Sequence, residues 1–118
     1  MAVHDPSKIS KLARKHFSSA LMSDTKWRKL FSVIQLHDLG VKRMIVKFID
    51  VDQPRQLRFP PSLAVPHAYM DTIEFGPVEL SSIEWLELPI EVESIVSPIG
   101  HFPLARVEGG ARIVGYRP

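Results

Sequence analysis

The sequence contains no cysteine, which excludes disulfide bonds, thiolate metal sites and cysteine nucleophiles. It also lacks long apolar runs, because the longest stretches without a charged side chain, residues 59–70 and 94–105, each contain at least two prolines. A membrane-spanning helix needs about 20 mostly apolar residues, so no transmembrane segment is predicted. The first residues lack the apolar core of a secretory signal, and we therefore expect a soluble, cytoplasmic protein.

Lysine is absent after Lys47, and the two halves of the chain carry opposite charge. Residues 1–58 contain 12 Lys and Arg against 5 Asp and Glu, whereas residues 59–118 contain 3 against 8. This asymmetry indicates either a basic binding surface or two halves that neutralise each other on folding. We favour neutralisation, because the length predicts a single domain over residues 1–118, whose halves lie within a few Debye lengths (each roughly 8 Å).

Two amphipathic helices are predicted at the start of the chain. Asp5 as N-cap and Pro6 at the first position favour a helix over residues 6–22, along which apolar residues recur at helical spacing. Capping side chains at residues 23–25 favour a second helix that ends near His37. Because only two or three residues would join them, we expect a helical hairpin or a near-right-angle corner.

The remaining chain has the patterns of strands and turns. Alternating residues predict strands over 41–51, 69–75 and 82–88, with Glu84 and Glu87 on opposite faces of the last one. The proline-rich segment 50–66 is interpreted as a long ordered loop or a set of short edge pieces, and residues 90–99 as a short helix. A hairpin is predicted over residues 104–117, with its turn at 108–110.

These elements predict an α+β fold in which the two N-terminal helices pack on an antiparallel or mixed sheet of about four to five strands. The first candidates for the core are the aromatic residues Trp27, Phe31, Phe17, Phe48 and Trp85.

Three segments carry a resemblance to a known family. They are residues 24–31 with Thr-Lys-Trp-Arg, residues 82–88 with Ile-Glu-Trp, and Gly100-His101-Phe102-Pro103 leading to Gly115-Tyr116-Arg117. Together they resemble a family of small bacterial proteins of uncharacterised function with such a start, strand and ending. The resemblance covers residues 24–117. It implies a shared core and assigns no catalytic residue, because the matched residues are mostly aromatic and aliphatic.

The sequence favours neither a metal site nor an enzyme. No two histidines lie within four residues of each other, so a metal site would need distant ligands such as His67, Asp71 and His101 to converge. Acid–base hydrolysis would need two carboxylates in one cleft, for which Asp71 and Glu84 on neighbouring strands are a conceivable pair. We therefore expect no metal, no cofactor and no catalytic residue. A small hydrolase using Asp71, Glu84 and either His67 or His101 is the least favoured alternative.

The leading hypothesis is a non-enzymatic protein-interaction domain, of the kind that neutralises a toxin or forms a homodimer through an edge strand. The candidate contact surfaces are the proline-rich segment 50–66 and the acidic region 71–93. The acidic candidates are Asp71, Glu74, Glu84, Glu87, Glu91 and Glu93.

The alternative hypothesis is nucleic-acid binding through the two basic helices. The candidate contacts are Lys8, Lys11, Arg14, Lys15, Lys26, Arg28 and Lys29. Two features oppose this hypothesis: the aromatic face of the second helix would be buried in the core, and the acidic second half would repel phosphate.

Overall fold

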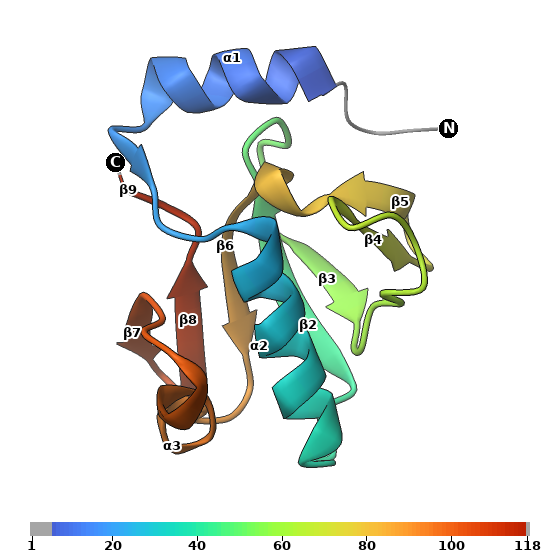
Figure 1. Ribbon diagram of the computed structural model, residues 1–118, viewed down its shortest axis with the longest axis vertical. Coiled ribbons are helices and arrows are strands. Elements are labelled where there is room, and N and C mark those ends of the chain that lie inside the picture. The colour runs from blue at the N-terminus through green and yellow to red at the C-terminus, as the bar shows by residue number, and fades with distance from the viewer. Residues whose placement is uncertain (1–5, 118) are drawn as a thin grey trace.

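The computed structural model describes residues 6–117, which form a five-stranded antiparallel sheet with α2 (Asp24–Leu36) and α3 (Glu93–Val96) on one face (Figure 1). The strand order is β3-β2-β6-β8-β7. The strands are β2 (Arg43–Phe48), β3 (Arg55–Arg58), β6 (Ile83–Leu88), β7 (Leu104–Val107) and β8 (Gly110–Val114). The predicted α+β class and antiparallel sheet are confirmed. Among the described residues, no helix is both long and apolar enough to cross a bilayer.

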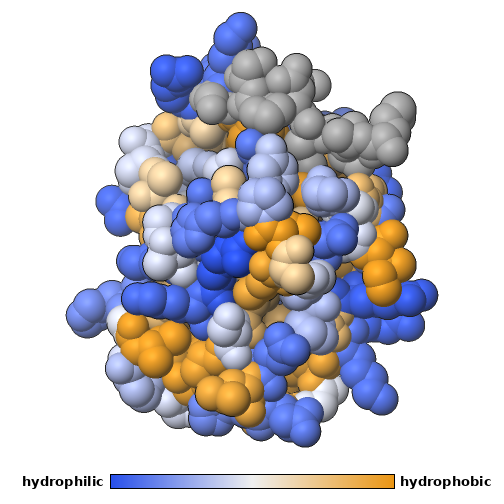
Figure 2. All heavy atoms as spheres, turned by 45° about the vertical axis from the view of Figure 1, so that its right-hand side comes forward, coloured by the Kyte–Doolittle hydropathy of each residue, from blue (hydrophilic) through white to orange (hydrophobic). Residues whose placement is uncertain are grey.

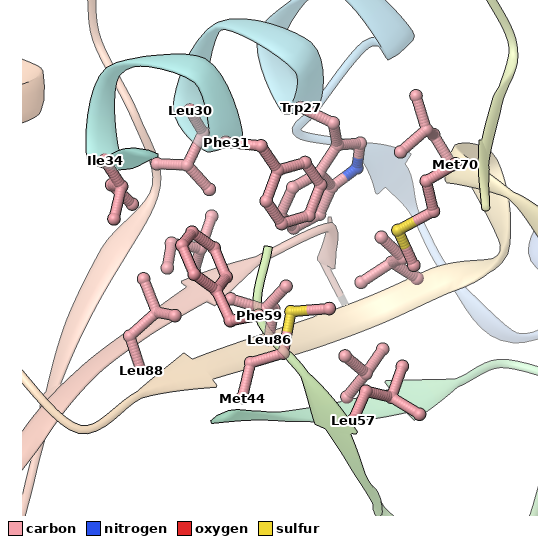
Figure 3. Packing of buried hydrophobic residues seen from close by; sticks show 14 of the residues in the cluster. Trp27, Leu30, Phe31, Ile34, Met44, Leu57, Phe59, Met70, Leu86 and Leu88 are labelled. Carbon is pink, nitrogen blue, oxygen red and sulfur yellow. The ribbon is translucent and has the colours of Figure 1, made fainter. Parts of the chain in front are cut away.

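Helix α2 (Asp24–Leu36) supplies the centre of the core. It begins at the N-cap Ser23, whose hydroxyl accepts the N–H of Lys26 at 3.1 Å. Its apolar stripe is buried against β2 and β6 (Figure 3). The buried residues of α2 are Trp27, Leu30, Phe31 and Ile34. The rings of Trp27 and Phe31 stack with centroids 6.1 Å apart. The predicted second helix and its packing on the sheet are therefore confirmed.

The first helix differs from its prediction. Helix α1 (Pro6–His16) ends before residue 22 and lies across one end of the molecule, away from the sheet face that α2 covers (Figure 1). The chain then forms β1 (Ser19–Ala20), which pairs with β9 (Tyr116–Arg117) near the C-terminus. Leu21 N–H also bonds to Gly115 O at 2.8 Å. The predicted continuation to residue 22 and the tight connection to α2 are wrong, because this backbone pairs with the C-terminal segment instead.

Two of the five aromatic core candidates lie outside the core, whereas Trp27, Phe31 and Phe48 are buried as predicted. Phe17 is only partly buried and packs on Tyr116, with ring centroids 5.1 Å apart. Trp85 is also partly buried, and its ring lies under the guanidinium of Arg112 on the sheet face that α2 does not cover. The expectation that Asp5 caps α1 lies outside the described residues.

Only the first part of the predicted strand over residues 69–75 is a strand, because residues 73–75 form a tight turn into a further strand that begins at Gly76. β4 (Tyr69–Thr72) pairs with β5 (Gly76–Glu79) as a separate two-stranded sheet. The buried Thr72 hydroxyl accepts the N–H of Phe75 and donates to Gly76 O, both at 3.0 Å. This side chain closes the turn, which has no signal in the alternating pattern. The 3-10 turn η1 (Leu80–Ser82) then leads into β6.

The C-terminal half of the sheet matches its prediction more closely. β7 and β8 form the predicted hairpin, with Gly109 at φ +78 in the turn. The predicted helix over residues 90–99 is present as the shorter α3 (Glu93–Val96) followed by the 3-10 turn η2 (Ser97–Ile99). Gly115 lets the chain pass close to β6, because a Cβ at this position would lie 2.3 Å from Ile83 O.

Arg28 fixes the proline-rich loop to α2. Its Nε donates to His67 O at 2.7 Å, and Nη1 donates to Leu63 O at 3.1 Å. Nη2 lies within hydrogen-bond distance of three further carbonyls, those of Val65, Pro66 and Tyr69. One guanidinium thus lies within hydrogen-bond distance of five backbone acceptors of a segment that has few internal pairings of its own. The segment 50–66 also contains the edge strand β3, in agreement with its interpretation as ordered loop and edge pieces.

We expect Arg28→Lys to lower the free energy of unfolding by about 2–3 kcal/mol, because an ammonium has three donors and cannot span five carbonyls. Urea denaturation measures this loss, and amide exchange in residues 63–69 should increase with it. Arg14→Lys on the exposed surface of α1 is the matched control and should change stability by less than about 0.5 kcal/mol. Equal stability of both variants would show that the carbonyl contacts contribute nothing.

Candidate functional site

An apolar depression lies on the outward side of α2, opposite the buried stripe. It is lined by Val33 and Leu36 of α2 and by Ile99 of η2, with Lys29 and Ser32 beside them. We call these five residues the α2 patch. Leu36 is 81% exposed. Figure 2 shows apolar side chains gathered near the lower end of the molecule, at the height where α2 ends in Figure 1. Exposed apolar groups that share a depression are typical of contact surfaces.

The basic residues of α2 do not form a surface for phosphate. Arg28 is committed to the loop carbonyls, and Lys26 Nζ donates to His101 O at 3.0 Å. Lys29 lies at the α2 patch. The three residues that the nucleic-acid hypothesis groups together therefore have three different environments, and two of them bind backbone carbonyls of the same chain.

The basic residues of α1 are arranged differently. Lys11, Arg14 and Lys15 are exposed on this helix. Lys8 belongs to α1, but its side chain lies outside the described residues. α1 lies at the end of the molecule and does not form the predicted helical hairpin with α2 (Figure 1). The cations of the two helices are therefore not arranged along two adjacent antiparallel helices.

Glu84 and Glu87 lie on the same sheet face, although strict alternation predicts opposite faces. The pairing of β2 with β6 shifts register between Lys47 and Phe48, so that Glu84 is an extra residue in β6. Glu84 Oε1 lies 3.3 Å from Lys47 Nζ, and Glu87 pairs with Arg112. Arg112 is centred 4.1 Å above the ring of Trp85. Both carboxylates are thus neutralised by cations of adjacent strands.

The other four acidic candidates are divided between two places. Glu74 accepts the N–H of Arg58 at 3.3 Å, at the edge of β3. Asp71 lines a depression with Arg58 and Ile73, and its backbone bonds to that of Ser62. Glu91 and Glu93 line a groove beside β7. The six acids predicted as one partner surface therefore occupy separate parts of the molecule.

Among residues 6–117, the side chains considered for a metal site and for a hydrolase do not come together as one site. His67 Nε2 lies 3.0 Å from the hydroxyl of Thr25, whereas Glu84 is paired to Lys47 on the open sheet face and Asp71 lies beside Ser62. Within residues 6–117, no group of three His, Asp or Glu side chains has the proximity that a metal ion requires. His4 lies outside the described residues. The proposed hydrolase residues are thus held by different partners.

The phenol of Tyr116 is half-buried near the C-terminus. Its hydroxyl donates to Ser81 O at 2.6 Å, next to the pairing of β1 with β9. Burial raises the pKa of Tyr116 above its ordinary value of 10.0, and the nearby carboxylates of Asp24 and Glu79 raise this pKa further. The phenol therefore stays protonated and holds the C-terminal segment to the turn before β6.

We expect the stability contributed by the Tyr116 hydroxyl to be lost at high pH. Because the folded pKa exceeds the unfolded one, the unfolded chain loses its proton first, and the free energy of unfolding falls as pH rises above 10.0. Tyr116→Phe should be about 1 kcal/mol less stable than the wild type at pH 8, and this difference should narrow above pH 10. Urea midpoints measured between pH 8 and 11 test this expectation, which parallel profiles would contradict.

No protein-family model, curated protein or solved structure matches the chain. The resemblance to small bacterial proteins, based on residues 24–31, 82–88 and 100–117, stays a prediction from the sequence.

Proposed function

We propose that this protein is a non-enzymatic protein-interaction domain that covers a surface of a protein partner, in the way an immunity protein covers a toxin. The observation that carries the proposal is the α2 patch. Leu36 is 81% exposed and Ile99 38% exposed, although both are large apolar side chains. Fully burying a side chain such as Leu contributes about 1.5–3 kcal/mol, so a partner that covers the patch gains from each.

The surroundings of the patch support this proposal. Lys26 holds the loop near η2 through His101 O, so that α2 and the segment carrying Ile99 are fixed relative to each other. α3 also packs on α2 through the buried Val96. The patch therefore lies on rigid elements, which reduces the ordering cost of binding.

Leu36→Glu tests the role of the patch. This substitution should weaken binding of the partner by about ten- to a hundredfold, because it places a charge where the partner would cover an apolar side chain. Immobilised wild-type protein and the variant are compared for capture of proteins from a lysate of the source cells, and purified partners are measured by calorimetry.

The matched control is Ile73→Glu, which also replaces an exposed apolar residue, 72% exposed on the β4–β5 turn. A partner retained by the wild type and by Ile73→Glu but lost with Leu36→Glu supports the proposal. Equal capture by all three proteins contradicts it. Sedimentation of the same proteins shows whether the partner is a second copy of the chain.

Nucleic-acid binding is the second candidate function, favoured by the exposed Lys11, Arg14 and Lys15 on α1. Each phosphate contact adds to the salt dependence of binding. This candidate predicts retention on a DNA or RNA column that falls steeply with added salt. Combined replacement of Lys11, Arg14 and Lys15 by Glu should abolish retention, and retention that survives it would contradict this role of α1.

A further inference from the structure

The two edges of the five-stranded sheet are treated differently. At the β3 edge, Glu74 accepts the N–H of Arg58, so a side chain covers an edge donor. At the β7 edge lies a groove of about 240 Å³, lined by β7, β8 and the start of α3. An edge strand without cover is a template for pairing with another chain. The β7 edge is therefore the place where an added strand fits.

The register shows which backbone groups of β7 point outward. Val114 N–H donates to Pro103 O at 2.9 Å, and along the same ladder Ala105 is opposite Arg112 and Val107 opposite Gly110. Hydrogen-bonded pairs alternate in an antiparallel ladder, so Ala105 and Val107 bond to β8. Arg106, between them, directs its N–H and C=O away from β8, at the open edge of the sheet.

The groove has an apolar base and a rim with two carboxylates and one guanidinium. Val92 is fully buried and Ala111 is 6% exposed, and both line the groove. Glu91 and Glu93 line it from the side of α3, Arg106 lines it from β7, and all three are exposed. A strand added to β7 would direct alternate side chains over this groove. An apolar residue would then meet Val92, and cations two positions before and after it would meet the carboxylates.

We propose that the β7 edge and its groove bind an extended, basic segment of a partner protein by strand addition. This inference rests on the proposed function and names one contact of the interaction. The two carboxylates outnumber the one guanidinium of Arg106, so the rim is net negative. Charge therefore favours a basic segment over a second copy of the chain, because pairing two β7 edges would bring two rims of like net charge together. The outward backbone groups of Arg106 provide the main-chain bonds, and Glu91 with Glu93 select the cations.

The probe is a blocked hexapeptide of sequence Lys-Thr-Val-Thr-Lys-Thr, called the Lys-Val peptide, in which both Lys residues and the Val share one face of the strand. It is titrated into the protein and followed by amide NMR. We expect a dissociation constant below about 1 mM and the largest changes at Arg106 and its neighbours. The same peptide with Glu in place of both Lys residues, and one that is N-methylated at alternate residues and cannot pair, should bind at least about tenfold more weakly. Equal binding of the Glu peptide, or changes confined to the α2 patch, would overturn the inference.

Variants of the protein test the same contact. Glu91→Lys should weaken the Lys-Val peptide by about five- to tenfold, whereas Asp52→Lys, the same charge change on an exposed loop, should alter it less than about twofold. Arg106→Pro removes an outward N–H and should abolish binding. If that variant does not fold, the N-methylated peptide and Glu91→Lys still test the strand addition.

The outcomes also separate this inference from the proposed function. Suppose that capture of the partner depends on Leu36 but is the same with Glu91→Lys, and that the Lys-Val peptide does not bind. This result overturns the strand addition and still supports the proposed interaction domain. Peptide binding at Arg106 together with capture that ignores Leu36→Glu supports the strand addition and contradicts the role of the α2 patch. A dimer in solution that Arg106→Pro dissociates would assign the edge to a second copy.

Discussion

The structure depends on the burial of one face of α2 against the sheet. Trp27 and Phe31 are each 1% exposed and lie over β2 and β6 (Figure 3). A large aromatic side chain contributes several kilocalories per mole when it is buried, and two of them on successive turns fix both the position and the rotation of the helix. The rotation of α2 then determines which of its other side chains face the sheet and which face outward.

Arg28 and the α2 patch follow from this rotation. With Trp27 directed into the core, Arg28 lies at the border and reaches the carbonyls of the proline-rich loop, which gives that loop its order. Leu36 remains on the outward side, where the sheet cannot cover it. The same helix therefore builds the core, fixes the longest loop and presents the surface that we propose for binding.

The opposite charges of the two halves of the chain have a local explanation. Lys47 from the basic half pairs with Glu84 from the acidic half across β2 and β6, and Arg58 lies beside Glu74 at the β3 edge. The Arg58–Glu74 pair, in which Arg58 is exposed, contributes little stability by itself. The Lys47–Glu84 and Arg58–Glu74 pairs neutralise charge on the open sheet face and at the β3 edge. Glu91 and Glu93 instead line the groove beside β7.

The sequence predicts the elements with regular periodicity and fails where long-range contacts decide. α2, β2, β6 and the final hairpin have clear periods and are found where expected. The extent of α1 is mispredicted because residues 18–21 pair with a segment at the other end of the chain. The bulge at Glu84 reverses the expected parity, and the bonds from Arg28 cross 35 to 41 positions of sequence. The α2 patch has no motif, because its members come from α2 and η2.

The most direct test of this account is the solvent accessibility of Trp27 in solution, measured by iodide quenching of fluorescence in a Trp85→Phe variant. Trp85 is the second of the two tryptophans, so the variant reports on Trp27 alone. The account predicts blue-shifted emission and almost no quenching, because the Trp27 side chain is 1% exposed between α2 and the sheet. Emission near that of free tryptophan, with full quenching in a folded protein, would show that α2 does not lie on the sheet.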